Sequence, residues 1–346
     1  MKPRFVMGKK EDIQLKDLDS FIELMMLYKQ EQLPYPAPTF EFWKKVWETP
    51  ILEEEEEYWV IALDENDNAI GYGLASWSIK YDNLDKAILR IFVKKEERRK
   101  GLGTQIISQL IENTPDQITV ISMGTVTTTD DGLKYLKSLK LEKCYEEIFQ
   151  YVDLEKTDTN KIRKITSEQR EKATKLGYDN KFIEGLDFAS QLDYPKYIQL
   201  VERIWNDMPL EDLHQEKLVM DQERYENYIK HMIGFGGRLL TVVLVHKETN
   251  EPIGYTNIFL NDHQPLVVQQ EDTGVLHEHR GKGLGYVLKM IMFEKILDET
   301  KAKYWSTGNA VSNQHMIRIN TELNHEKFAN FLVFEFKKEE WSELLK

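Results

Sequence analysis

The chain of 346 residues is long enough for two domains, and its 41% hydrophobic and 30% charged residues are ordinary for a globular protein. A net charge of -13 argues against nucleic-acid binding, which requires a basic surface. Cys144 is the single cysteine, which excludes an internal disulfide, and no apolar run approaches the roughly 20 residues of a membrane span. We therefore expect a reduced, cytoplasmic protein with neither a nucleic acid nor a membrane as partner.

The first half of the chain alternates strand and helix patterns. Residues 59–73 have the pattern of strand, polar turn and strand, and the acidic run 53–57 precedes them. We interpret that run as a solvated loop or helix end, with an acidic rim for a cationic ligand as the alternative. The later predicted elements are a strand at 87–93, a helix with Ile106, Ile107, Leu110 and Ile111 on its apolar face, a strand at 118–125, a helix at 132–139 and a strand at 144–154.

The second half repeats this order. Residues 156–179 are polar and lack a strand pattern, so they are expected to form a linker and a helical lead-in. The elements predicted after them are a hairpin at 241–257, a strand at 267–276, a helix through Leu288, Ile291, Met292 and Ile296, a strand at 303–309, a helix from about 313 and a strand at 328–336. The expected organisation is a domain at 1–155, a linker at 156–179 and a domain at 180–346.

The two halves also share a glycine motif. A shift of 182 residues places Arg98 on Arg280 and Gly101 on Gly283, and it also aligns the glycines two positions later. The two hairpins align at a shift of 183, so one residue was gained or lost between hairpin and motif. The simplest explanation is duplication of one domain.

Each glycine motif lies between a predicted strand and a predicted helix. The first N–H groups of a helix have no partner in the helix, and they point outward at the positive end of its dipole. Glycines at this point let phosphate oxygens approach the backbone, and Arg98 or Arg280 can add a charged hydrogen bond. The spacing fits neither a Walker loop nor a dinucleotide fingerprint. The motif therefore predicts a phosphorylated ligand of another kind.

The motif Arg-x-x-Gly-x-Gly, with a hairpin upstream, resembles the pyrophosphate loop of the GNAT superfamily of acetyl-CoA-dependent acyltransferases. The resemblance covers almost the whole chain as a tandem pair, similar in organisation to mycothiol synthase. It implies an α+β fold of two tandem GNAT-like domains, each a mixed, mostly antiparallel sheet with helices on both faces. The positions it implies for acetyl-CoA binding are Val275, Leu276, Arg280, Gly281, Lys282, Gly283, Leu284, Gly285, Asn309 and Asn313, and in the first copy Val93, Arg98, Arg99, Lys100, Gly101, Leu102, Gly103 and Thr104.

The resemblance also implies acetyl transfer to a small-molecule amine, with an amide donor to the carbonyl oxygen near Val275. The tyrosine acid that many members carry in the last helix is replaced by Asn320 in the second copy, and its place in the first copy falls on Leu136, with Tyr135 beside it. This departure leaves the proton donor to the thiolate unassigned. It favours, as an alternative, a non-enzymatic acetyl-CoA sensor or scaffold.

Two adjacent carboxylates distinguish the second copy. Glu271 is our first candidate for the base that deprotonates the amine and Asp272 the second, whereas the first copy has Leu89 and Arg90 there. Strand alternation would place Glu271 on one face with Thr273 and Val275. This contrast favours chemistry in the second domain, with an enzyme active in the first domain as the alternative. The other interpretation of both carboxylates is that they are solvated or cap a bulge.

Other polar residues carry weaker signals. The residues Trp205, Asp207, Glu211 and Asp212 lie in a segment that the resemblance places beside the acceptor, or they form an amphipathic helix and a polar loop. His277 and His279 are interpreted as polar turn residues, because no further ligands complete a zinc site. Cys144 is expected to be a small buried strand residue.

Overall fold

The structure is a computed structural model and describes residues 3–188 and 190–346. Its strands are β1 (Arg4–Gly8), β2 (Glu55–Leu63), β3 (Ala69–Ser78), β4 (Lys86–Val93), β5 (Val120–Val126), β6 (Lys143–Asp153), β7 (Tyr178–Glu184), β8 (Gly237–His246), β9 (Pro252–Asn261), β10 (Val267–Val275), β11 (Tyr304–Ala310) and β12 (Glu326–Lys337). Its helices are α1 (Leu18–Gln30), α2 (Phe40–Glu48), α3 (Leu102–Glu112), α4 (Asp131–Ser138), α5 (Thr159–Lys175), α6 (Tyr194–Asn206), α7 (Gln222–Gly234), α8 (Leu284–Glu299), α9 (Gln314–Glu322) and α10 (Trp341–Leu344).

The chain forms two compact units, neither of which is a continuous stretch of sequence. Unit 1 comprises Met1–Glu147, Leu210–Lys217 and Ala329–Lys346, and unit 2 comprises Ile148–Pro209 and Leu218–Phe328. Strands β6 and β12 therefore each contribute residues to both units. The last residues of the chain complete unit 1, because β12 pairs antiparallel with β5 from Phe331 to Lys337.

The sheet is mixed and mostly antiparallel. The described strands follow the order β1-β2-β3-β4-β5-β12-β6-β11-β10-β9-β8-β7. The pairings of β4 with β5 and of β10 with β11 are parallel, and they occupy equivalent positions in the two repeats. This arrangement confirms the α+β fold of two tandem domains that the resemblance implied.

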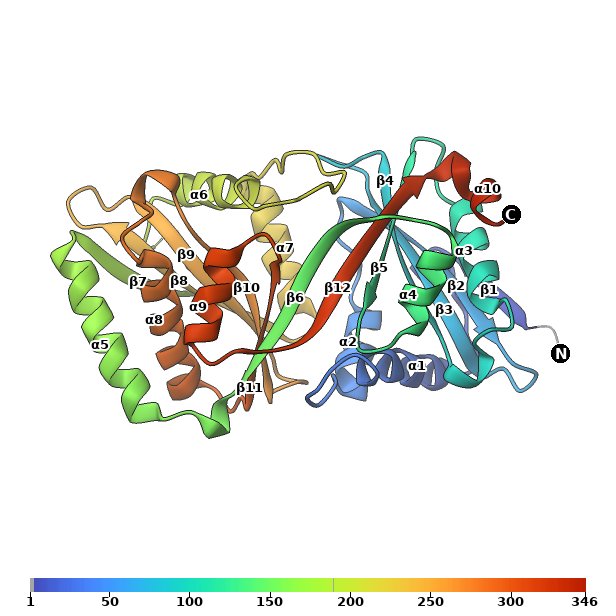
Figure 1. The fold of residues 1–346 in the computed structure, drawn as a ribbon, viewed down its shortest axis with the longest axis horizontal. Coiled ribbons are helices and arrows are strands. Elements are labelled where there is room, and N and C mark those ends of the chain that lie inside the picture. Colours follow the sequence, from blue (N-terminus) through green and yellow to red (C-terminus); the bar gives the residue numbers. More distant parts are fainter. Residues whose placement is uncertain (1–2, 189) are drawn as a thin grey trace. The chain divides into compact units, whose positions relative to one another are not determined.

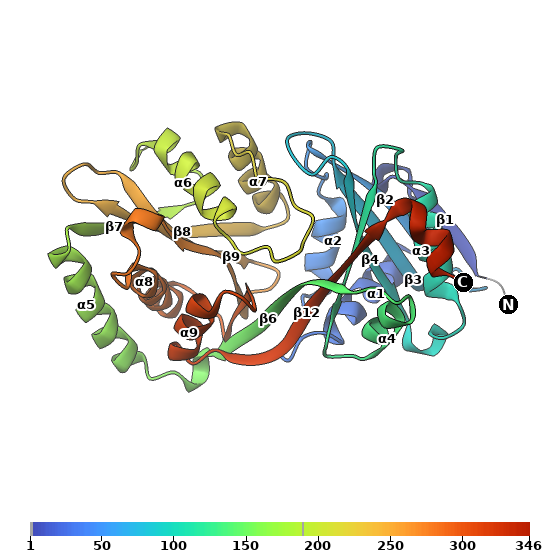
Figure 2. The same cartoon turned by 45° about the horizontal axis from the view of Figure 1, so that its top comes forward.

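Helices cover both faces of the sheet in each unit (Figure 1). In unit 1, α3, α4 and α10 pack on one face around Ile106, Leu110 and Trp341, and α1 and α2 cover the other around Phe21 and Trp59. In unit 2, α5, α8 and α9 share one apolar cluster with the sheet, and α6 and α7 belong to a second cluster (Figure 2). The site described below lies on both faces of β10 in unit 2.

The structure departs from the sequence expectations at several places. Strands β1 and β7 are additional, whereas helix α5, which packs on α8, lies within residues 156–179, where a linker and a helical lead-in were expected. The acidic run is only partly a loop: Glu53 and Glu54 form a turn, whereas Glu55–Glu57 pair with Trp77 and its neighbours as the first residues of β2. The pKa of Glu57 is raised by burial, although Trp59 donates a hydrogen bond to it. Among the described helices, none has the length and apolarity needed to cross a membrane.

Candidate active site

Both glycine motifs form left-handed turns that start a helix. Gly101 has φ 81° and Gly283 has φ 78°, and each is the N-cap of its helix without any side-chain cap. The first amide bonds inside the helices come from Gln105 to Gly101 O (3.1 Å) and from Val287 to Gly283 O (3.2 Å). The amides of residues 102–104 and 284–286 precede these bonds and point out of the helix N-termini. Both turns thus have the backbone geometry of a phosphate site.

The arginine of each motif stabilises the turn from inside. Arg280 Nε donates to Val275 O (2.8 Å), and Arg98 Nε makes the same bond to Val93 O (2.9 Å). Arg280 also pairs with Asp207 at the C-terminal end of α6 (2.7 Å). Arg98 pairs in addition with Glu31 (2.5 Å) and Asp131 (3.0 Å), so each guanidinium fixes the strand end against the loop.

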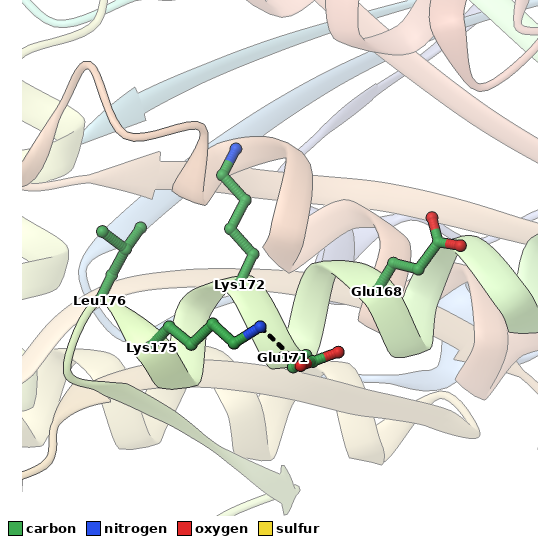
Figure 3. A pocket seen from close by; sticks show the side chains of 5 residues that line it. All are labelled: Glu168, Glu171, Lys172, Lys175 and Leu176. Atoms are coloured by element: carbon green, nitrogen blue, oxygen red, sulfur yellow. Dashed lines mark ion pairs between the residues drawn. The ribbon is translucent and has the colours of Figure 1, made fainter.

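A polar pocket lies beside the second glycine turn. It is lined by Gln169, Lys172, Gly283, Tyr286, His315, Arg318, Ile319 and Glu322. A Cβ atom added at Gly283 would lie 3.2 Å from Lys172 Nζ, so this ammonium group lies directly at the turn. Lys172 also borders a second hollow along α5, where Lys175 pairs with Glu171 (2.6 Å) while the Lys172 side chain is directed away from them (Figure 3). The lining of that hollow is confined to α5 and its C-cap Leu176, whereas the pocket that contains Gly283 adjoins the glycine turn.

The two asparagines expected at the coenzyme site have internal partners. Asn313 is the N-cap of α9, where its side chain accepts from the Met316 amide (3.2 Å). Asn309 Oδ1 accepts from Asn320 Nδ2 (2.6 Å), and Asn320 is fully buried. The amide of Asn320 therefore connects α9 to β11.

Strand β10 carries a bulge at the two candidate carboxylates. Its pairing with β9 shifts by one residue between Gln270 and Thr273, so Glu271 and Asp272 together lie opposite Asn257. The pairing of β3 with β4 has no such shift. The copy with the bulge is nevertheless one residue shorter between hairpin and glycine motif, because the loop 262–266 before β10 is two residues shorter than the loop 79–85 before β4.

Because of the bulge, the strand alternation expected from the sequence is wrong at Glu271. Thr273 Oγ1 lies 2.7 Å from Thr256 Oγ1, and Val275 belongs to the apolar cluster around α8. Asp272 instead contacts Tyr255, which belongs to the cluster around α6 and α7. Glu271 therefore does not share a face with Thr273 and Val275, because the extra residue reverses the alternation.

Aromatic donors surround the two carboxylates. Asp272 Oδ2 accepts hydrogen bonds from Trp205 Nε1 (2.8 Å) and from Tyr255 Oη (3.2 Å), and the Asp272 amide donates to Asn257 Oδ1 (2.8 Å). Glu271 Oε2 accepts a longer bond from Tyr228 Oη (3.4 Å). The two acids are half-buried between α6, α7 and β9.

Burial changes the acidity of this pair. Burial, together with the neighbouring charge of Asp272, raises the pKa of Glu271 to about 7. Burial also raises the pKa of Asp272 to about 6, although the hydrogen bonds from Trp205 and Tyr255 act in the opposite direction. At neutral pH, Asp272 is mostly ionised and Glu271 exchanges its proton near the ambient pH. Such values are typical of functional acids and bases.

The end of β10 directs one backbone N–H group away from β9. The parallel pairing of β10 with β11 covers Val267 to Gln269 only. The Leu276 amide donates to Ile253 O (2.9 Å), so by alternation the Val275 amide faces away from β9. This N–H lies where the resemblance implied the donor to a carbonyl oxygen.

Unit 1 has a different set of groups at the equivalent place. Arg90 is exposed on an uninterrupted β4, where its NH1 donates to Ser76 Oγ (3.4 Å). The hydroxyl groups of Tyr135 and Thr104 lie 3.2 Å apart at the first turn of α3. Unit 1 therefore combines a glycine turn with a tyrosine, and unit 2 combines a glycine turn with two carboxylates.

Of the four residues expected to wall the acceptor site, two belong to unit 1 and not to unit 2. Trp205 and Asp207 belong to unit 2, whereas Glu211 and Asp212 belong to unit 1, where the Asp212 amide donates to Cys144 O (3.1 Å). The residues that sequence reasoning missed are Tyr228 and Tyr255. For Tyr255 the signal was its place in the repeated Ile-Gly-Tyr of the hairpin.

The remaining sequence candidates have structural partners. His279 Nδ1 lies 2.9 Å from Tyr178 Oη, to which Lys282 Nζ also donates (2.7 Å). Burial raises the pKa of the Cys144 thiol to about 11, which opposes a role as a nucleophile. Among the described residues, no three His, Cys, Asp or Glu side chains are arranged to hold a metal ion.

Comparison with known families identifies the chain. The model of the acetyltransferase (GNAT) family matches residues 19–135 and 200–319. The chain therefore belongs to the GNAT family of acetyltransferases, with one family region in each half. No curated protein matches it.

Solved structures share the tandem fold at low sequence identity. A tandem GNAT protein from the clavulanic acid biosynthesis pathway matches with a TM-score of 0.76 and 17% identity, over 97% of this chain and 99% of that one. A GCN5-related N-acetyltransferase from Sphaerobacter thermophilus matches with a TM-score of 0.65 and 11% identity, over 96% of both chains. A glucosamine N-acetyltransferase region of a fungal multi-domain GH3 β-N-acetylglucosaminidase has the same TM-score and 11% identity, over 97% of this chain and 38% of that one. These likenesses establish the fold.

Proposed function

We propose that the chain is an acetyl-CoA-dependent N-acetyltransferase that modifies a small-molecule amine, with its chemistry in unit 2. The observation that carries the proposal is the carboxylate pair Glu271–Asp272, which the bulge of β10 presents upstream of the glycine turn. Family membership supports acetyl transfer, and the uncapped amides at the start of α8 fit the coenzyme's phosphates. The pocket cations Lys172 and Arg318 add charge complementarity there.

Protein groups support two requirements of the reaction, deprotonation of the amine and stabilisation of the carbonyl oxygen. Glu271 takes the proton that the amine must lose, and the amine nitrogen forms a bond to the thioester carbonyl carbon. The Val275 amide donates to the carbonyl oxygen as that oxygen gains negative charge. The carbon–sulfur bond breaks, the thiolate takes up a proton, and the products are an amide and a free thiol.

The aromatic surroundings fit a cationic acceptor. The rings of Trp205, Tyr228 and Tyr255 adjoin the two carboxylates, and an alkylammonium group is attracted both by such rings and by negative charge. Asp272, which is mostly ionised at neutral pH, supplies the negative charge that orients the amine while Glu271 accepts the proton.

One observation favours a second candidate, in which unit 1 performs the chemistry. Tyr135 on α4 directs its hydroxyl to the first turn of α3, where it lies 3.2 Å from that of Thr104 and could protonate a leaving thiolate. The equivalent of the carboxylate pair is Arg90 and an apolar neighbour, so unit 1 lacks the base that unit 2 provides. Tyr135→Phe distinguishes the two: it lowers turnover only if unit 1 is active.

The direct test is release of free thiol from acetyl-CoA in the presence of a panel of amines, including amino sugars, polyamines and amino acids. Acetylation of any member with formation of the amide supports the proposal. Tight binding of acetyl-CoA without turnover on the panel would instead support a sensor or scaffold.

A further inference from the structure

A buried polar network lies behind the bulge, on the face of β10 that α8 covers. It consists of Gln270 on β10, Lys289 on α8 and Trp305 on β11, and all three side chains are buried. Lys289 occurs within the apolar run of α8, which is otherwise packed in the core of unit 2. None of these groups takes part in the chemistry proposed above.

The side-chain amide of Gln270 joins the two strands at the bulge. Its Nε2 lies 2.6 Å from Asn257 O and 3.0 Å from Asp272 O, with the hydroxyls of Thr256 and Thr273 at 3.1 and 3.3 Å. The first carbonyl belongs to the residue opposite the bulge and the second to a bulge residue. The amide nitrogen thus replaces the regular strand pairing that the extra residue interrupts.

Lys289 fixes the orientation of that amide. Its Nζ donates to Gln270 Oε1 (2.9 Å) and lies 4.6 Å from the centre of the Trp305 ring. The protonated Lys289 only donates and the two carbonyls only accept, so Oε1 faces Lys289 and Nε2 faces the carbonyls. Among the described residues, no carboxylate forms an ion pair with Lys289.

The position of Lys289 is costly, which indicates a specific role. Burying an ammonium without an anion is strongly unfavourable, and accordingly burial lowers the pKa of Lys289 to about 7. His325 is buried next to the same Trp305 ring, and burial lowers its pKa well below the usual value, so it is neutral there. As a packing residue, Lys289 contributes little that an aliphatic side chain could not provide.

Unit 1 provides the internal comparison. Six residues after the glycine turn, where unit 2 has Lys289, unit 1 has Ile107, which packs in its apolar core together with Leu89 of β4. Strand β4 has no bulge and no carboxylate pair. The lysine, the bulge and the two acids therefore occur together in one unit and are absent together from the other.

We propose that Gln270 and Lys289 are positioning residues that hold the β10 bulge, and so hold Glu271 and Asp272 toward the amine acceptor. The inference rests on the proposed function for its catalytic consequence, but the structural claim is independent of turnover. Lys289 acts through Gln270, and Gln270 acts through the carbonyls of Asn257 and Asp272.

The test uses Lys289→Met and Gln270→Leu in the full chain. Lys295→Met is the matched control, since Lys295 lies on the same helix but pairs with Glu299 near the surface (2.7 Å). The carboxyl groups of Glu271 and Asp272 are titrated by carbon NMR, and turnover of an accepted amine is measured against pH. If the bulge relaxes, both carboxyls become better hydrated and their pKa values fall toward about 4.

The expected result is that both variants remain folded, shift the carboxyl titrations downward and lower kcat at least about tenfold, while the KM for acetyl-CoA stays the same. Lys295→Met should change neither the carboxyl titrations nor kcat. Unchanged carboxyl titrations in both variants would overturn the proposal, whether or not the enzyme turns over any amine. If the titrations shift but the wild type acetylates nothing, the positioning role stands and the proposed function fails.

Discussion

Trp205 Nε1 on α6 lies 2.8 Å from Asp272 Oδ2 on the bulge of β10. This bond joins the helix that walls the candidate acceptor site to the strand that carries the candidate base. Because the indole donates to the ionised carboxylate, it lowers the pKa of Asp272 and so counteracts the increase that burial causes. It also leaves Glu271, which has a weaker donor, as the acid with the higher pKa of about 7.

We expect Trp205→Phe to raise the pKa of Asp272 above its value of about 6, because the variant lacks the indole donor. A larger fraction of Asp272 is then protonated near pH 6, so the acidic limb of the pH–rate profile should move to higher pH. Trp43→Phe is a suitable control, since the Trp43 indole nitrogen has no partner among the described residues. An unchanged pH–rate profile would show that this hydrogen bond does not control the pKa of Asp272.

Glu271→Gln should lower kcat by about 10²- to 10⁴-fold, the usual contribution of a general base. Binding of acetyl-CoA should be unaffected, because the Glu271 carboxylate contacts Tyr228 of α7 and does not line the pocket at Gly283. The wild-type rate should fall as the pH drops below about 7, where Glu271 becomes protonated. Glu57→Gln changes a carboxyl of unit 1 whose pKa is also raised by burial, and it should leave turnover intact. A Glu271→Gln variant with normal rates across pH would exclude Glu271 as the base.

The same substitution should change stability in a pH-dependent way. The folded-state pKa of Glu271 is about 7, whereas an unfolded glutamate titrates near 4.3, about the ordinary value. The folded protein therefore favours the protonated form, and its stability falls as the pH rises from the unfolded pKa to the folded one. Glutamine imitates the protonated acid, so Glu271→Gln should raise the Tm at pH 8 and leave it nearly unchanged at pH 4. An equal change at both values would contradict the raised pKa.

Lys172→Glu should weaken acetyl-CoA binding, because the ammonium group lies at the Gly283 turn and faces the proposed phosphate site. Lys175→Glu is the matched control on the same helix, where Lys175 is paired with Glu171 (Figure 3). Titration calorimetry at two salt concentrations measures both effects, and the loss in Lys172→Glu should diminish at high salt. Equal losses in the two variants would indicate a general charge effect.

Much of this architecture could be predicted from the sequence, because it depends on local patterns. The strand expected at 144–154 is β6 (Lys143–Asp153), and the helix expected at 132–139 is α4 (Asp131–Ser138). The repeat itself indicated two glycine turns in equivalent contexts, and both have the left-handed geometry that favours glycine. The contrast between Glu271 and its aligned position Leu89 indicated that the carboxylate pair belongs to unit 2.

What could not be predicted depends on pairing between distant segments. The segment Leu210–Lys217 and the C-terminal residues from Ala329 join unit 1, which no local pattern reveals. The bulge arises from the register of β9 against β10, and the spacing of the two copies does not reveal it, because a shorter loop before β10 outweighs the extra residue. Lys289 could be seen in the sequence as a lysine in an apolar helix. Its partner Gln270 lies on a different element, strand β10, so the contact could not be predicted from a local pattern.

The most direct test of the central claim compares Gly103→Glu with Gly285→Glu. Both residues lie in the first turn of their helices, and an added Cβ meets its nearest neighbour at 3.9 and 3.5 Å, so neither substitution forces a clash. Glutamate suits a helix N-terminus, yet it places an anion where phosphate should bind. The measurement is the rate of thiol release from acetyl-CoA with an accepted amine. The account predicts that Gly285→Glu abolishes turnover and that Gly103→Glu retains it; loss of turnover in Gly103→Glu alone would place the chemistry in unit 1.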